Sequence, residues 1–382
     1  MDTTTLRAAA RYFPLLGRPR PACPPLASRV QEIADIADTA YRVQQQGGDA
    51  LHDAAHALNK AALLASDCGL TDEARRLCWR HIDLYCEAGP QLTAVQARYM
   101  LEPVVNLARL HIRNNELRTA LHILEAMHHA TTRGTDLTVD DRLLPLAQLT
   151  GTLQERNKLR EWVWLQLLTD GIRALTRDER WNDAVALAEV HRGIGTHLME
   201  GRQVAILAAC LDGTTDAARD LLHTSTLTQP WEHQVASCLE VMCGGSDKPD
   251  HHRTITTMIQ SFRNSRPAAG YAVFRARFGL TTAILARSHS LELAAAVLAQ
   301  AADEAIAARD GYAAREVLNH RVPHTGLTDQ QHRALDGLIA ASGLGAGPLP
   351  PMLQDAFTDA ISIAVTALTV SLKKSSASSR RG

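Results

Sequence analysis

Residues 62–78 read ALLASDCGLTDEARRLC, and residues 108–124 read ARLHIRNNELRTALHIL. Each stretch begins with an alanine that is followed twelve positions later by another alanine, Ala74 or Ala120, with a short polar turn between them. Two antiparallel helices pack closely only where small residues lie at their crossing, and a hairpin of fixed length fixes the offset between those residues. The two stretches therefore predict two copies of one helix hairpin.

Further copies extend this pattern along the chain. A third begins at Ile172 and places Ala184 at the same offset, a fourth surrounds Ala218, and a weaker fifth is centred on Ala294. From Ala74 onward, the spacings between these signature alanines are 46, 64, 34 and 76 residues. Stacked hairpins bury their apolar faces on one another. We therefore expect an all-α fold built from antiparallel helix-hairpin repeats, an α-solenoid with irregular spacing.

Composition favours the same fold class. Aromatic residues make up only 4% of the chain, and helical periodicity dominates from about Ser28 onward. A β-strand is indicated by a run of alternating β-branched residues next to a hairpin turn, and we find no such run in the sequence.

The second copy carries a family resemblance. Leu107 and Ala108 form a Leu-Ala pair, His111 takes an aromatic place, Asn115 a turn-glycine place, and Ala120 the signature alanine. In these residues the chain resembles the tetratricopeptide repeat family, in the irregular style common in actinobacteria. The resemblance implies a helical array whose concave groove binds a partner.

We expect five segments. A proline-rich arm covers residues 1–27, and the tetratricopeptide-like repeat domain covers residues 28–342. A Gly/Pro linker (343–352), a C-terminal helix (353–372) and a disordered basic tail (373–382) follow. The helix contains Asp359 and several hydroxyl residues, which make it too polar and too short for a membrane span.

Charge and cysteine content limit the partners and the compartment. The chain has 40 basic and 41 acidic residues among 382, so it lacks the positive charge typical of direct nucleic-acid binding. Its seven cysteines include no C-x-x-C pair, which suits buried thiols in a reducing cytoplasm. We expect a cytoplasmic protein that binds no membrane.

Two groups of residues resemble metal sites. HDAAH at residues 52–56 places two histidines four apart on one helical face, but two histidines alone are an unspecific pattern. A second group comprises His233, Cys238, Cys243, His251 and His252, whose spacing matches no standard zinc site. We expect neither group to bind a metal, and we expect no cofactor.

Two arginine pairs recur at fixed positions. Arg109 and Arg113 lie eleven and seven residues before their signature alanine, and Arg173 and Arg177 lie at the same distances before theirs. Like charges four residues apart destabilise a helix slightly, so a repeated pair indicates an anion or an acidic neighbour.

In tetratricopeptide proteins that bind peptide tails, Lys, Asn and Arg residues of the groove hold a carboxylate, and the resemblance implies a similar role here. Lys60 and Asn106 each lie fourteen residues before their alanine. The candidate partner-binding groove comprises His56, Asn59, Lys60, Asn106, Arg109, Arg113, Arg173 and Arg177. The alternative is a solvated face whose arginines pair with acids such as Glu116 and Glu179.

The leading hypothesis is a non-catalytic scaffold or adaptor that binds a partner protein or an acidic peptide segment in this groove. This hypothesis is compatible with homo-oligomerisation. No G-x-S-x-G elbow, phosphate-binding loop or dinucleotide fingerprint suggests catalysis. One alternative is a regulatory sensor that binds a peptide or metabolite and controls a biosynthetic enzyme or transcription factor. Another is an all-α enzyme that uses His52, His56 and His111.

Overall fold

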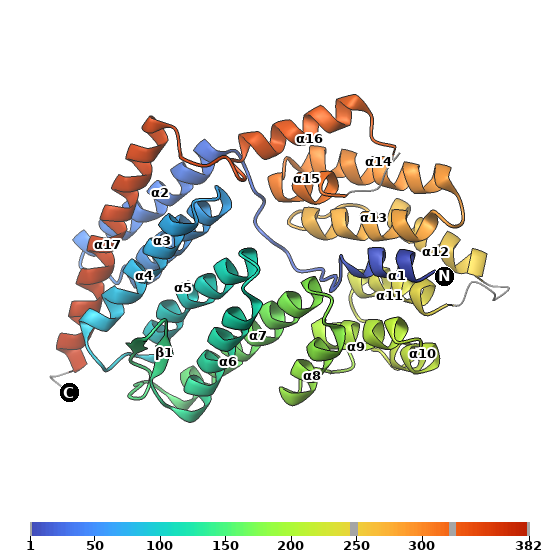
Figure 1. The fold of residues 1–382 in the computed structure, drawn as a ribbon. Coiled ribbons are helices and arrows are strands. Elements are labelled where there is room, and N and C mark those ends of the chain that lie inside the picture. The colour runs from blue at the N-terminus through green and yellow to red at the C-terminus, as the bar shows by residue number, and fades with distance from the viewer. Residues whose placement is uncertain (1, 245–250, 321–325, 380–382) are drawn as a thin grey trace. The chain divides into compact units, whose positions relative to one another are not determined.

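The computed structural model describes residues 2–244, 251–320 and 326–379. Within these ranges the backbone forms seventeen helices and one two-stranded hairpin, which confirms the all-α fold class (Figure 1). The chain divides into two compact units that alternate along the sequence. Unit 1 comprises Met1–Pro25 and Leu175–Ser342, and unit 2 comprises Leu26–Ala174 and Gly343–Gly382.

Unit 2 consists of helices from both ends of its sequence. The last helix, α17, packs along α2 and α3 and also contacts α4 (Figure 1). The helices are α2 (Leu26–Gln45), α3 (Leu51–Asp67), α4 (Thr71–Ala88), α5 (Ala94–Arg113), α6 (Leu117–Arg133), most of α7 (Leu153–Arg177) and α17 (Pro351–Ser379).

The expected hairpins form in unit 2. Helix α3 pairs with α4 across Gly69, and α5 pairs with α6 across Asn115. Both turn residues have positive φ angles, 85° and 63°, a conformation that glycine and asparagine tolerate best. The signature alanines Ala74 and Ala120 are 1% and 0% exposed, which allows the paired helices to approach closely.

One short β-hairpin corrects the expectation that the chain has no strands. Leu137–Val139 (β1) pairs antiparallel with Arg142–Leu144 (β2). The turn consists of Asp140 and Asp141, with φ angles of 48° and 61°. A two-residue hairpin turn requires such angles, and aspartate tolerates them better than most residues. The Asp-Asp pair between two apolar stretches was the available signal.

The segment expected to be a linker is anchored to α3. The backbone N–H groups of Gly345 and Gly347 donate to the carbonyl oxygens of Asp67 and Cys68, each at 2.8 Å. These carbonyls lie at the C-terminal end of α3, where they have no partner within the helix. The Gly/Pro segment therefore caps α3 and positions the start of α17.

Helix α17 is longer than the sequence suggested. It continues through Ser379 and so includes most of the expected basic tail, whereas residues 380–382 lie outside the described residues. Among the described residues, Pro351–Lys374 is the one helical stretch long and apolar enough to cross a membrane by length and composition. Here Phe357, Ala364 and Leu368 are buried against the unit.

Unit 1 contains the remaining helices and the N-terminal segment. Its helices are α1 (Thr3–Ala10), α8 (Trp181–Val190), α9 (Glu200–Leu211), α10 (Thr215–His223), α11 (Pro230–Cys243), α12 (His251–Asn264), α13 (Ala272–Ala286), α14 (Leu291–Ala308), α15 (Gly311–Leu318) and α16 (Asp329–Ala341). Helices α13 and α14 pack side by side, and α1 lies against α13.

The proline-rich arm is part of the core of unit 1. Its first residues form α1, and the stretch that follows is held by tertiary hydrogen bonds. The Gln203 side chain accepts from the N–H of Leu15 at 2.8 Å and donates to the carbonyl of the same residue at 2.7 Å. Gly17 packs so closely on Trp231 that a Cβ atom there would overlap the indole.

Candidate functional site

Side chains from three helices of unit 2 meet on one surface, which we call the α3–α5–α7 face. Its members recur at three- or four-residue multiples, so they lie along one side of each helix. They are His52, His56, Asn59 and Ser66 on α3; Tyr99, Glu102, Asn106, Arg109 and Arg113 on α5; and Gln166, Asp170 and Arg173 on α7.

Three hydrogen bonds with the same sequence separation join α3 to α5. His52 Nδ1 is hydrogen-bonded to Tyr99 Oη at 2.9 Å, and Asn106 Nδ2 donates to Asn59 Oδ1 at 2.6 Å. In the third contact, the Arg113 guanidinium donates to the Ser66 hydroxyl. In all three pairs the residues are 47 positions apart in sequence. Successive contacts are two helical turns apart, so α3 and α5 run parallel and in register.

Arg109 joins α5 to α7. Its Nε and Nη2 atoms lie 3.1 and 2.9 Å from Asp170 Oδ2, and Nη2 also donates to Gln166 Oε1 at 3.4 Å. Asp170 additionally receives Arg173 Nη1 at 3.5 Å. Because Arg109 Nη1 also reaches Asn106 Oδ1 at 3.5 Å, the polar contacts continue across all three helices.

A second aspartate bridges two helices. Asp67, the last residue of α3, receives Arg29 Nη2 of α2 at 2.6 Å and Arg113 Nη2 of α5 at 3.1 Å. Its side chain is 3% exposed, whereas that of Arg113 is 42% exposed. Asp170 and Arg109 show the same order, at 2% and 39%. The carboxylates therefore lie beneath the guanidinium groups, and the accessible surface of these ion pairs is cationic.

Titratable groups gather in the N-terminal halves of α3 and α5. The rings of His52 and His56 are stacked, with centroids 6.0 Å apart. Burial, assisted by the charges of Lys60 and His52, lowers the pKa of His56. Burial also raises the pKa of Glu102, against the attraction of Arg98, which lies 3.1 Å away. Both His56 and Glu102 therefore favour their neutral forms at this end of the face.

The structure brings most of the predicted groove residues together. His56, Asn59, Asn106, Arg109, Arg113 and Arg173 lie on the α3–α5–α7 face. Lys60 is directed instead toward α2, where it pairs with Glu32 at 2.8 Å. Arg177 lies in the part of α7 that belongs to unit 1.

Sequence reasoning missed the acid that organises the α3 end of this surface. Asp67 precedes Ala74 by seven residues, the same offset that separates Arg113 from Ala120. Opposite charges at equivalent repeat positions were therefore a usable signal for an ion pair between neighbouring hairpins. Arg29, the second partner of Asp67, lies outside the repeat pattern and carried no such signal.

The histidines and cysteines that the sequence suggested for an enzyme or metal site do not all lie together. His111 contacts Glu116 and Arg75, so it does not join His52 and His56. Cys238 contacts Thr282 at 3.9 Å. The described residues contain no group of three or more His, Cys, Asp or Glu side chains arranged to hold a metal ion.

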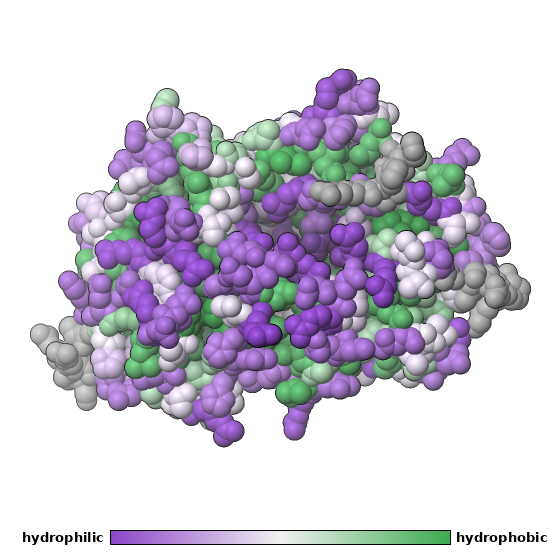
Figure 2. Space-filling model, viewed as in Figure 1, coloured by the Kyte–Doolittle hydropathy of each residue, from purple (hydrophilic) through white to green (hydrophobic). Residues whose placement is uncertain are grey.

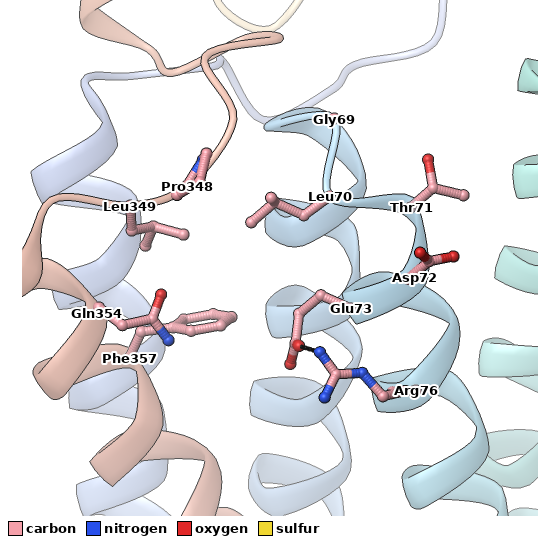
Figure 3. Close-up of a pocket in the computed structure, with 10 residues that line it drawn as sticks. All are labelled: Gly69, Leu70, Thr71, Asp72, Glu73, Arg76, Pro348, Leu349, Gln354 and Phe357. Atoms are coloured by element: carbon pink, nitrogen blue, oxygen red, sulfur yellow. Dashed lines mark hydrogen bonds and ion pairs between the residues drawn. The ribbon is translucent and has the colours of Figure 1, made fainter.

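A cavity of about 480 Å³ lies between the start of α4 and the start of α17 (Figure 3). Leu70, Leu349 and Phe357 form its apolar part, and Gln354 lies beside them. On the α4 side, Glu73 is paired with Arg76. The cavity therefore combines an apolar wall with a charged rim, and its volume falls within the range of small-molecule sites.

At the α3–α5–α7 face itself the side chains are tightly packed. The hollow beside Ser66, Arg109 and Arg113 measures only about 10 Å³, room for roughly one water molecule. The view in Figure 2 shows a mostly hydrophilic surface over α4, α5 and α6 of the same unit. Because this hollow is too small for a ligand, binding there would use polar groups at the surface.

Comparisons with known proteins give no family assignment. No protein-family model matches the chain, and searches of curated proteins and of solved structures found no match either.

Proposed function

We propose that this protein is a non-catalytic, cytoplasmic helical-repeat adaptor whose α3–α5–α7 face binds an acidic segment of a partner protein. The observation that carries the proposal is the placement of Arg109 and Arg113 above buried aspartates. Their guanidinium groups are fixed by the carboxylates beneath them and remain about two-fifths exposed.

The constant register of α3 and α5 supports a repeat arrangement. Three contacts with one sequence separation are expected when a hairpin is followed by a copy of itself with the same orientation. In a tetratricopeptide-like array the first helices of successive hairpins line the concave side. Helices α3, α5 and α7 would occupy those places here.

The chemistry of arginine supports an acidic partner. A guanidinium has five N–H donors in a planar fork and can bind a second carboxylate while it holds the first. A side chain already fixed by an ion pair loses less conformational entropy on binding than a free one. Exposed arginines above buried aspartates are thus pre-positioned to bind carboxylates.

The experiment must leave each buried aspartate with a partner. In the double variant Arg113→Gln with Arg173→Gln, Asp67 retains Arg29 and Asp170 retains Arg109. We expect this variant to fold and to bind a tetraglutamate peptide with a free C-terminus about tenfold more weakly, a change of about 1.4 kcal/mol. Isothermal titration at low and physiological salt measures this loss.

The matched control is Arg118→Gln with Arg133→Gln, which removes two exposed arginines from α6, so that both double variants have the same net charge. Equal binding by the two double variants, or equal binding by wild type and the Arg113/Arg173 variant, would refute the proposal. An amidated peptide shows whether the terminal carboxylate contributes.

A second candidate is a regulatory sensor that binds a metabolite, favoured by the cavity between α4 and α17. Its volume and mixed lining suit a small molecule with one apolar part. A thermal-shift screen of metabolites against wild type and Gln354→Ala tests it. Stabilisation that the variant loses would support the sensor, and the absence of any stabilising compound would count against it.

A further inference from the structure

Two cysteine thiols lie in contact inside unit 1. The Sγ atoms of Cys210 on α9 and Cys243 on α11 are 3.2 Å apart. The residues are 5% and 1% exposed, so neither sulfur lies on the surface. Cys243 belongs to the second metal-like group of the sequence, and its sulfur contacts that of Cys210, which lies outside that group.

The position of both cysteines at helix ends bears on what the pair can do. Cys210 is the penultimate residue of α9, and Cys243 is the last residue of α11. A disulfide bond is about 2.05 Å long, so the sulfurs must approach by roughly 1 Å to bond. Movement at two helix ends breaks few helical hydrogen bonds, because the last turns have few to lose.

The surroundings hold the two ends together. Arg219 of α10 donates from Nε to the carbonyl oxygen of Cys243 at 3.2 Å and pairs with Asp216 at 2.5 Å. Helix α10 packs against both α9 and α11. A covalent link between the two cysteines would therefore join elements that already share a neighbour.

We propose that Cys210 and Cys243 are a modification site, where a low-molecular-weight disulfide such as oxidised glutathione converts the two thiols into an intramolecular disulfide. One thiol loses its proton and attacks the small disulfide, which releases one thiol and leaves a mixed disulfide. The second cysteine, also deprotonated, attacks its partner's sulfur and releases the second small thiol. Two cysteine thiols are oxidised, and one small disulfide is reduced to two thiols.

Burial and the local environment both slow this reaction, because the small disulfide reaches the two sulfurs only when the ends of α9 and α11 open locally. The hydrogen bond with Cys210 and burial both raise the pKa of the Cys243 thiol, so its thiolate is scarce at neutral pH. The disulfide should form slowly at pH 7 and faster at pH 9. In a compartment with a strongly reducing glutathione pool the two cysteines stay as thiols.

The test uses the full chain with Cys86→Ser, which removes the one cysteine that is not buried. After incubation with oxidised glutathione, free thiols are blocked and peptides are mapped without reduction. We expect the loss of two hydrogens in mass, a cross-linked peptide pair containing Cys210 and Cys243, and a higher melting temperature. Reduction with dithiothreitol should restore the original mass.

Two variants complete the design. Cys210→Ser in the same background should show neither the cross-link nor the rise in melting temperature, whereas Cys238→Ser should show both. If a serine variant does not fold, the peptide map of the parent chain still decides the matter. Retention of both thiols, a stable glutathione adduct, or a cross-link between other cysteines would overturn the proposal.

Discussion

The side-chain amide of Asn106 on α5 donates from Nδ2 to Asn59 Oδ1 on α3 at 2.6 Å, in the middle of the α3–α5 contacts. Two helical turns before this pair, His52 contacts Tyr99, and two helical turns after it, Ser66 contacts Arg113. The amide pair thus sets the register of two parallel helices at the centre of the proposed binding surface.

Replacing Asn106 with alanine should destabilise unit 2. Asn106 is 5% exposed, so its removal leaves the Asn59 amide without its partner in a part-buried position. We expect a loss of about 1–3 kcal/mol in the free energy of unfolding, measured by urea denaturation. Asn157→Ala, at an exposed position on α7, is the control and should change stability by less than about 0.5 kcal/mol.

Asp67→Asn should lower the free energy of unfolding more than Arg113→Gln does. The first change leaves both Arg29 and Arg113 without their carboxylate, whereas the second leaves Asp67 paired with Arg29. We expect Asp67→Asn to lower the free energy of unfolding by about 3 kcal/mol, since removing one partner of a buried ion pair leaves charge uncompensated. Chemical denaturation of both single variants and of the double variant measures the coupling. Equal effects of the two single changes would contradict the bridging role of Asp67.

His81 should make stability depend on pH. Its side chain is buried on α4, neither ring nitrogen has a hydrogen-bond partner among the described residues, and burial lowers its pKa from 6.5 to about 3. Between these two values the unfolded chain binds a proton that the folded chain excludes, so stability falls as pH decreases from 6.5 toward 3.

The substitution His81→Leu removes this dependence of stability on pH, because leucine does not titrate. Relative to wild type, the variant should gain about 3 kcal/mol in unfolding free energy when the pH is lowered from 7 to 4.5. Equilibrium unfolding of both proteins at several pH values gives the difference. A difference that stays constant across this range would show that His81 is protonated equally in the folded and unfolded chains.

Gly17→Ala should destabilise unit 1. The added methyl group would overlap the Trp231 indole, and the arm is fixed on both sides of this position by hydrogen bonds. Overpacking of this kind costs about 1–3 kcal/mol, which thermal unfolding can detect. Gly195→Ala is the matched control in the same unit, because a Cβ atom there would meet no atom within 4 Å.

The local part of this structure was predictable from the sequence. Periodic apolar residues indicated helices, and the spacing of Ala74 and Ala120 indicated hairpins, because both signals depend on residues that are close in sequence. The same offsets placed Arg109 and Arg113 on one face with Asn59 and Asn106. These are consequences of helix geometry, so a repeated sequence pattern reveals them.

The long-range part was not predictable. Pairing of α17 with α2, the Gly345 contact with α3, and the Gln203 contact with the arm all join segments that are far apart in sequence. Glycine and proline marked these segments as irregular, but composition does not show which surface an irregular segment contacts. The acidic partner of Arg109 was hidden for the same reason, since many acids were available and only the fold selects Asp170.

The Gly345 and Gly347 contacts with α3 have a consequence for synthesis of the chain. The helices that present Asn59 and Arg113 leave the ribosome early, whereas the segment that caps α3 and the helix that packs along α2 and α3 follow only after the whole of unit 1. Unit 2 therefore lacks part of its core for most of translation. The proposed binding surface on α3, α5 and α7 therefore reaches its final surroundings only after residues 343–372 have emerged.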